Sequence, residues 1–252
     1  MPALLEGGCR VTTLKEGPPV EHAGLRVFRH AGRESGAAAI SLRVLELAPG
    51  VSPGLRNRDC DEVLYVLDGR GTALLDGHPE PLAPGAGFYL PPGVTLTLQN
   101  PGPQPLTLVS SRCPDPSPQD AVVEPVTRPL GPRRSPWPFV RLEERLAEVT
   151  GDRWYRVLVD PRAGSHHVTQ FVGGIPPGRA PDHFHHYEEV LCILSGRGRM
   201  WAGSTSAPIE PGSCIFLPKR QPHCVENQGD GELRLLGVFY PAGSPAVRYD
   251  SR

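Results

Sequence analysis

Residues 178–198, GRAPDHFHHYEEVLCILSGRG, concentrate side chains that can bind a metal ion. His183 and His185 are separated by one residue, and Glu189 follows His185 by four. In an extended segment, side chains an even number of residues apart lie on one face, so these three groups are expected to point the same way. Two imidazoles and a carboxylate directed into one space indicate a site for a divalent metal ion.

The composition narrows the classes of protein that can carry such a site. The 252 residues hold 26 basic and 27 acidic side chains, a formal net charge of -1, which provides no basic surface for nucleic acid or membrane lipid. No apolar run approaches the roughly 20 residues that cross a bilayer. The first residues lack a basic region followed by an apolar stretch, so secretion is not expected. The six cysteines form no CxxC pair, so a reducing compartment, the cytoplasm, is expected.

An internal repeat organises the chain. EVLYVLDGRG at 62–71 matches EVLCILSGRG at 189–198, and this offset of 127 holds without a gap as far as Pro114 and Pro241. Between Glu62 and Asn100, 13 of 39 positions are identical in the two copies. Chance does not keep register for so long, so the chain is predicted to be a tandem duplication.

Each copy is predicted to be a β-barrel. Short runs of alternating apolar and polar residues are punctuated by 29 glycines and 31 prolines, a pattern typical of all-β domains whose sheets pair or close. We expect an N-terminal barrel over residues 1–114, an extended proline-rich linker over 115–140 and a C-terminal barrel over 141–252. The one helix expected covers RLEERLAEV, residues 141–149.

The second copy resembles the cupin family in two motifs. The first comprises a glycine, an HxH pair, a glutamate and a second glycine; the second comprises a glycine, a proline, a histidine and an asparagine. The matching residues here are Gly178, His183, His185, Glu189 and Gly196, followed by Gly212, Pro218, His223 and Asn227. Arg220 stands where the family prefers glycine, so that turn is expected to differ. The resemblance implies a bicupin: two tandem double-stranded β-helix (jelly-roll) barrels with little helix.

The expected metal site then consists of His183, His185, His223 and Glu189. Such a set suits one divalent transition metal ion, Fe, Mn, Ni, Zn or Cu, and leaves open positions in an octahedral arrangement. With one carboxylate, the site carries a formal charge of +1, so a small anionic substrate is expected.

The first copy is expected to bind no metal. At the offset of 127, Arg56, Arg58, Glu62 and Leu96 occupy the four ligand positions. Arginine has no lone pair to donate and leucine has no donor atom, so only the glutamate survives. We expect Arg56 or Arg58 to pair with Glu62.

Gln170 is the candidate for a substrate-contacting, catalytic residue. Upstream of the motif an offset of 128 aligns Gln170 with Leu42, which is expected to face the interior of the first barrel. A polar side chain in place of leucine next to a metal can bind a ligand, and a buried amide satisfied by the backbone is the alternative.

What the resemblance implies for function is a metal-dependent small-molecule enzyme, with a non-haem dioxygenase of an enolic, diketone or catechol-like substrate favoured. The alternatives are a manganese decarboxylase, an isomerase, a ureidoglycine aminohydrolase-like hydrolase, and a non-catalytic bicupin that binds a small molecule. Neither nucleic acid nor membrane partners are expected, and both a monomer and a homodimer remain open.

Overall fold

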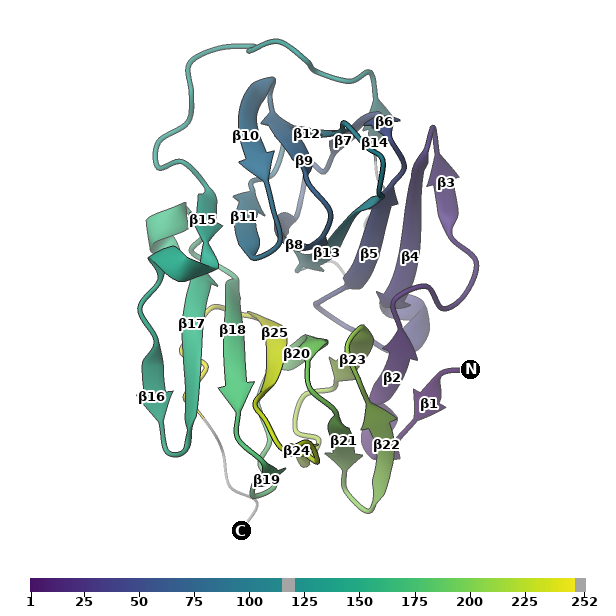
Figure 1. Ribbon diagram of the computed structural model, residues 1–252, viewed down its shortest axis with the longest axis vertical. Helices are drawn as coiled ribbons and strands as arrows, with labels where there is room; N and C mark the ends of the chain where they lie inside the picture. Colours follow the sequence, from purple (N-terminus) through teal and green to yellow (C-terminus); the bar gives the residue numbers. More distant parts are fainter. Residues whose placement is uncertain (115–120, 248–252) are drawn as a thin grey trace.

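Two β-barrels lie one above the other along the long axis of the molecule, one drawn in purple to teal and the other in green to yellow (Figure 1). The computed structural model describes residues 1–114 and 121–247 and confirms the all-β class, with only four short 3₁₀ turns beside the strands, at Glu6–Gly8, Arg33–Ser35, Leu142–Glu144 and Pro161–Ala163. The residues 115–120 of the expected linker, and 248–252, lie outside the described part.

The N-terminal barrel is formed by a large and a small sheet. The large sheet has the order β15 (Phe139–Arg141), β11 (Ala86–Leu90), β8 (Asp61–Asp68), β13 (Leu106–Cys113), β5 (Leu42–Leu47), β4 (Leu25–Ala31) and β3 (Val20–His22). The small sheet has the order β10 (His78–Leu82), β9 (Gly71–Leu75), β12 (Thr95–Asn100), β7 (Gly54–Arg56) and β14 (Ala121–Val123), and β6 (Gly50–Val51) also pairs with β12.

The C-terminal barrel repeats this plan. Its large sheet has the order β1 (Ala3–Leu4), β2 (Arg10–Thr13), β23 (Ser213–Leu217), β20 (Glu188–Ser195), β25 (Leu233–Tyr240), β18 (Thr169–Ile175), β17 (Arg153–Val159) and β16 (Glu148–Thr150). Its small sheet has the order β19 (Gly178–Arg179), β24 (His223–Asn227), β21 (Gly198–Ala202) and β22 (Thr205–Ile209).

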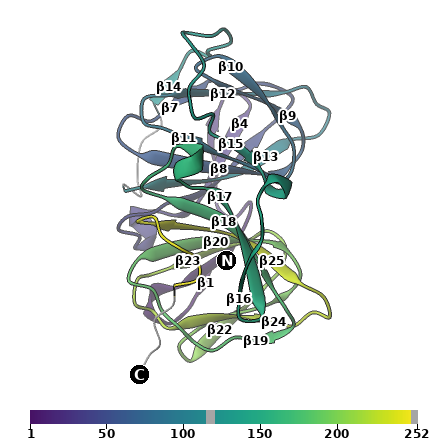
Figure 2. The ribbon, with the colours of Figure 1, turned by 90° about the vertical axis from the view of Figure 1, so that its left-hand side faces the viewer.

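The large sheets are buried on both faces (Figure 2). One face of each large sheet packs in the interior of its own barrel, and the opposite face packs against the large sheet of the second barrel. In β8, Leu64 and Val66 belong to the interior of the N-terminal barrel, whereas Val63 and Tyr65 pack in the cluster shared by the two barrels. Alternation along these strands therefore separates two buried environments rather than core from solvent.

Each barrel also receives a strand from the other half of the chain. β2 pairs with β23 of the C-terminal barrel, and β15 pairs with β11 of the N-terminal barrel. Cys9 and Val11 accordingly pack in the interior of the C-terminal barrel. The expected boundaries at 1–114 and 141–252 therefore do not coincide with the strand pairing at either end, because sequence periodicity says which residues form strands but not which sheet receives them.

The expected helix over 141–149 is wrong. Its residues contribute the end of β15, the 3₁₀ turn Leu142–Glu144 and the start of β16. Arg141 pairs with β11, and Glu148 and Val149 pair with β17, in place of helical hydrogen bonds; an isolated helix of nine residues is marginal by itself.

Two further expectations concern the cysteines and membrane-spanning segments. All six cysteines are buried and free within the part that the structure describes. Among the described residues, the model contains no helix with the length and apolar character needed to cross a membrane.

Candidate metal centre

The backbone holds His183 and His223 side by side. The N–H of each donates to the carbonyl of the other, at 3.0 Å from His183 and 2.8 Å from His223, in an isolated antiparallel bridge. The centroids of the two rings are 4.6 Å apart. Residues forty positions apart in the sequence are thus brought together by main-chain pairing at one end of the small sheet.

His185 completes a group of three imidazoles. Its carbonyl accepts the N–H of Arg220 at 2.6 Å, and its ring centroid lies 5.0 Å from that of His183 and 5.2 Å from that of His223. Arg220 has φ of 64°, so the turn forms with arginine in the left-handed conformation that glycine usually supplies.

The spacing of the candidate nitrogens fits a single ion. One ligand atom from each histidine lies within 4.8 Å of the others. Two nitrogens each about 2.1 Å from one ion are at most about 4.2 Å apart, so binding an ion would require the three rings to move closer together. Within the described part of the chain, this is the one group of three or more histidine, cysteine, aspartate or glutamate side chains with such spacing.

The hydrogen bonding of His223 leaves one ring nitrogen available to bind a metal ion. Its Nδ1 lies 2.8 Å from the carbonyl oxygen of Gln221, and because a carbonyl only accepts, Nδ1 carries the proton of the neutral ring and Nε2 keeps its lone pair. Burial lowers the pKa of His223, which favours that neutral form.

Glu189 lies beside the three histidines but outside their closest group. Its Oε2 is 3.4 Å from Nε2 of His185, and only 7% of the residue is exposed. Burial raises the pKa of Glu189 to about 8. A dication next to this carboxyl would restore the ionised form, so its environment fits a metal ligand. The role of Glu189 as the fourth ligand stays a prediction.

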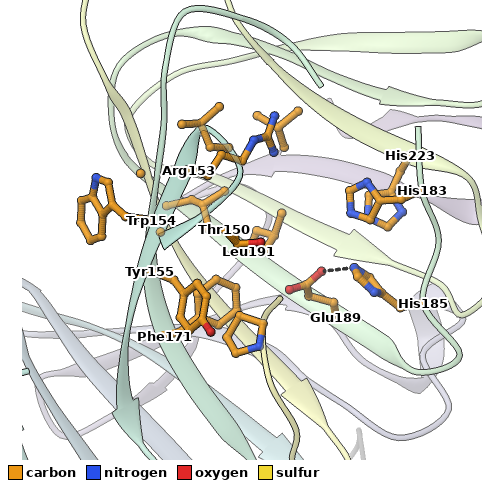
Figure 3. Close-up of a pocket in the computed structure, with 16 residues that line it drawn as sticks. Thr150, Arg153, Trp154, Tyr155, Phe171, His183, His185, Glu189, Leu191 and His223 are labelled. Carbon is orange, nitrogen blue, oxygen red and sulfur yellow. Dashed lines mark ion pairs between the residues drawn. The ribbon is translucent and has the colours of Figure 1, made fainter. Parts of the chain in front are cut away.

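These four residues line a cavity of about 100 Å³ that opens to one side of the C-terminal barrel. Most of the other walls are apolar, and Figure 3 shows them on the side of the cavity away from the histidines. A water molecule's share of liquid volume is about 30 Å³, so the cavity suits a ligand of a few heavy atoms. The apolar lining includes Tyr155, Phe171, Ile175, Leu191, Val225, Leu235 and Pro245.

Arg153 lines the same cavity and was not predicted. It precedes Tyr155 by two residues on β17, and Tyr155 packs in the barrel interior, so Arg153 has the inward parity. The sequence did carry a signal: at the offset of 128, Arg153 aligns with Leu25, which is fully buried in the other barrel. The second copy thus has a charged residue where the first copy has a core leucine.

Gln170 is not a pocket residue, contrary to expectation. It is fully buried, but its amide oxygen points at Gly87 of the other barrel, 2.7 Å from where a Cβ of Gly87 would lie. The neighbouring Phe171 lines the pocket instead. The alignment with Leu42 holds, yet Leu42 also packs between the barrels, so both residues lie on the face opposite to the one assigned. Neither amide atom of Gln170 has a hydrogen-bond partner among the described residues.

The strand register also corrects the ligand positions assigned to the first copy. Leu96 pairs with Leu55 as His223 pairs with His183, and the N–H of Gly93 donates to the carbonyl of Asn57 as that of Arg220 donates to His185. The counterparts of His183 and His185 are therefore Leu55 and Asn57. Arg56 and Arg58 are displaced from these positions because the first copy has one extra residue before Glu62.

Glu62 is paired, but not with the arginines expected. Nε of Arg112 donates to it at 2.7 Å, Nη2 of Arg43 at 2.7 Å and the hydroxyl of Ser110 at 2.6 Å, all within the N-terminal barrel. Arg56 instead donates to the hydroxyl of Thr95. The carboxylate that the first copy retains is thus fully occupied by buried cations.

Comparison with known proteins agrees with the barrels and their duplication. The family described as Cupin domain matches residues 43–111 and 171–239, more than half of the chain, and the protein belongs to this family. An uncharacterized protein of Methanocaldococcus jannaschii is 38% identical over 58 residues, which are 22% of this chain and 46% of that relative.

Solved structures extend the likeness to the arrangement of two barrels. An oxalate decarboxylase of Bacillus subtilis superposes with a TM-score of 0.72 at 16% identity, over 92% of this chain and 77% of that chain. A protein of Pseudomonas aeruginosa described as glyoxylate-induced superposes with a TM-score of 0.70 at 19% identity, over 94% of this chain and 91% of that chain. At these identities the likeness defines the bicupin fold.

Proposed function

We propose that this bicupin is a metal-dependent enzyme that acts on a small carboxylic acid in its C-terminal barrel. The observation that carries the proposal is the convergence of His183, His185 and His223 on one space, at the edge of a cavity that opens to one side of the barrel. A divalent transition metal ion held there, with Glu189 as fourth ligand, supplies Lewis acidity and, for a redox-active ion, a one-electron couple.

The chain's own residues define what the cavity accepts. A dication with one carboxylate carries a net positive charge, and Arg153 adds a second positive charge to the same cavity. Apolar side chains such as Phe171, Leu191 and Leu235 exclude water and so strengthen these interactions with an anion. A small anionic molecule is the ligand that this combination favours.

Within this class we propose cleavage of an enolic or 2-oxo acid by dioxygen as the reaction. Among the described residues that line the cavity, Glu189 carries the one carboxyl group, and the proposal assigns it to the metal. Tyr155 donates its hydroxyl to Glu148 at 2.8 Å. The lining thus offers little acid–base chemistry, which suits a reaction that relies on the metal and its open positions.

Decarboxylation of a small acid is the second candidate. The observation in its favour is the likeness of the fold to the Bacillus subtilis oxalate decarboxylase, an enzyme with Mn(II) centres. An arginine in the cavity also suits a carboxylate substrate.

Oxygen uptake and carbon dioxide release, measured together, separate these reactions. The metal-free protein is loaded in turn with Fe(II), Mn(II), Co(II) and Ni(II) and given a panel of enolic, 2-oxo and dicarboxylic acids. Oxygen consumed in proportion to product supports the dioxygenase, and carbon dioxide released without net oxygen consumption supports the decarboxylase. Failure of every metal to bind at the three histidines would overturn the proposal.

Gly173→Leu is the matched variant for this assay. Gly173 takes the place of Leu45 in the register of the first barrel, and its nearest neighbours lie 3.5 Å or more from an added Cβ, so a side chain enters the cavity without a clash at Cβ. We expect Gly173→Leu to bind metal normally but to lose turnover at least about tenfold. Gly231→Leu, at a position with no atom within 4 Å of an added Cβ, is the control.

A further inference from the structure

A column of stacked rings leads from the interior of the C-terminal barrel to one of the three histidines. The ring of Tyr187 lies parallel to that of His185, with an interplanar angle of 7° and centroids 4.8 Å apart. The ring of Phe239 stacks on Tyr187 in turn, at 21° and 4.7 Å. Parallel rings at these distances are stacked with an offset, and rotation of one ring against the other loses contact. The plane of the His185 imidazole is therefore set by its neighbour in the column.

The inner end of this column is held by the sheet. Phe239 is 1% exposed, and on β25 it pairs with Glu189 of one neighbouring strand and with Thr169 of the other. Tyr187 packs against the same interior cluster as Phe239, and it does not line the cavity. A buried ring on a central strand thus supports Tyr187, and Tyr187 covers one face of His185.

The orientation that results directs His185 toward the proposed metal centre. Its Nε2 lies 3.4 Å from Oε2 of Glu189 (Figure 3). Rotation of the imidazole out of the plane of Tyr187 would turn Nε2 away from this position. The stack therefore does for His185 what the hydrogen bond to the carbonyl of Gln221 does for His223.

The N-terminal barrel forms without such a column. The counterpart of His185 is Asn57, and the four residues that separate Asn57 from the retained glutamate, RDCD at 58–61, include no aromatic residue. Arg112 stands at the place of Phe239. The barrel fold thus does not require the two rings, which occur in the copy that has the three histidines.

We propose that Tyr187 is a positioning residue of the metal centre, whose stacked ring keeps the imidazole of His185 turned toward the ion. The inference rests on the metal centre of the proposed function and goes beyond it by assigning a residue outside the cavity lining. The face of a tyrosine ring is negative, and an imidazole bound to a dication takes on part of its positive charge, so the stack is stronger in the metal-bound state. Tyr187 thus contributes to metal affinity as well as to packing.

Three substitutions of Tyr187 separate the ring from the rest of the side chain. Tyr187→Phe keeps the stack without the hydroxyl, Tyr187→Leu removes the ring, and Tyr187→Met keeps a long apolar side chain in case the leucine variant does not fold. The matched control is Phe139→Leu, which breaks a stacked pair with Phe88 in the N-terminal barrel, at 21° and 4.4 Å.

Three measurements on the full chain are needed. Competition with a chelator at fixed pH gives the affinity for Co(II), and the visible absorption of cobalt at saturation reports its coordination geometry. Urea unfolding of the metal-free protein gives the stability of each variant.

We expect Tyr187→Leu to weaken Co(II) binding about 10- to 100-fold, the loss typical of a group that orients a metal-binding histidine. The absorption of the cobalt that this variant binds should also change, and Tyr187→Met should behave in the same way. Tyr187→Phe should stay within a few-fold of the wild type with an unchanged spectrum. Phe139→Leu should lower the stability but leave the Co(II) affinity and the spectrum unchanged.

Two results would overturn this inference and leave the proposed function standing. One is a loss of stability in Tyr187→Leu and Tyr187→Met with the Co(II) affinity and absorption of the wild type, because that pattern indicates packing alone. The other is equal weakening of Co(II) binding in Tyr187→Phe and Tyr187→Leu, which would assign the effect to the hydroxyl. A wild type that binds no cobalt would overturn the proposed function, and this inference with it.

Discussion

The two barrels share one architecture but keep their buried glutamates in opposite electrostatic environments. Glu62 lies among Arg43, Arg112 and Ser110, which satisfy its charge permanently. At the matching places around Glu189 the C-terminal barrel has Phe171, Phe239 and Gly237. The same carboxyl group therefore belongs to an ion-pair network in one barrel and lies beside three histidines in an apolar setting in the other.

Steric changes accompany the electrostatic ones. Leu25, Leu45, Leu55 and Leu96 fill the N-terminal barrel, each no more than 2% exposed. Their counterparts are Arg153, Gly173, His183 and His223, all of which line the cavity of the C-terminal barrel. A few substitutions at interior positions thus convert a packed barrel into one with a cavity and donor atoms, and the outer fold does not change.

The largest effect is expected from giving the second barrel the leucine of the first. His223→Leu removes one of three imidazoles and introduces the residue found at position 96. We expect affinity for Co(II) to fall more than about 100-fold, since even loss of a group that only orients a ligand costs about 10- to 100-fold. Metal analysis after dialysis measures it. His166→Leu, an exposed histidine that does not line the cavity, should keep full occupancy.

The reverse exchange should damage the first barrel without creating a metal site. Arg112→Phe introduces the residue that the second barrel has at 239 and breaks an ion pair whose two side chains are each 1% exposed. Removing one partner of a buried pair costs about 3–5 kcal/mol, measurable by urea unfolding of the metal-free protein. Arg234→Phe disrupts an exposed pair with Glu232 and should cost at most about 1 kcal/mol. Equal losses of unfolding free energy in Arg112→Phe and Arg234→Phe would show that the buried pair of Glu62 is no stronger than an exposed one.

The pH dependence of stability sharpens the difference between the two glutamates. Burial raises the pKa of Glu189 from 4.5 to about 8, so its contribution to the metal-free fold is full below about pH 4.5 and is lost as the pH rises through 8. Burial lowers the pKa of His223 from 6.5, and that contribution is lost as the pH falls below 6.5. Between pH 6.5 and 8, Glu189 is therefore the one of these two residues whose titration changes the stability.

We expect the melting temperature of the metal-free protein to fall from pH 6.5 to 8, and Glu189→Gln to flatten this fall because the amide does not titrate. Glu62→Gln is unsuitable as a control because it breaks the ion pairs, so Glu226→Gln, a partly exposed residue of β24, replaces it. An unchanged slope in Glu189→Gln would show that another group titrates.

A smaller effect is expected from changing the N-terminal segment that packs on the C-terminal barrel. Gly7 has φ of 69°, and a Cβ there would lie 1.5 Å from the side-chain amide oxygen of Gln221. The main-chain carbonyl of Gln221 is the group that orients the ring of His223. Gly17, with φ of 83° and no atom within 4 Å of an added Cβ, isolates the backbone contribution. Gly7→Ala and Gly17→Ala should each lose about 1–2 kcal/mol of stability. Only Gly7→Ala should also weaken Co(II) binding, by a few-fold. Equal Co(II) affinity of the two variants would show that the N-terminal segment does not influence the metal site.

Much of this organisation was predictable because it follows from local spacing. The offset of 127 defined the duplication, and the HxH pair with His223 defined the three imidazoles that the structure brings together. Which face of a strand looks inward was not predictable, because the large sheets are buried on both faces and apolar alternation fits either. Gln170 was misplaced for that reason. The pairing of Glu62 was missed because Arg43 and Arg112 come from strands far from it in sequence.

The central claim is that the C-terminal barrel binds one metal ion and the N-terminal barrel binds none. Anomalous diffraction from crystals grown with Co(II), collected at the cobalt edge, tests it directly. The account predicts one peak per chain, about 2.0–2.2 Å from a nitrogen of each of His183, His185 and His223 and from an oxygen of Glu189. A peak beside Glu62, or no peak with the three imidazoles turned away from one another, would contradict it.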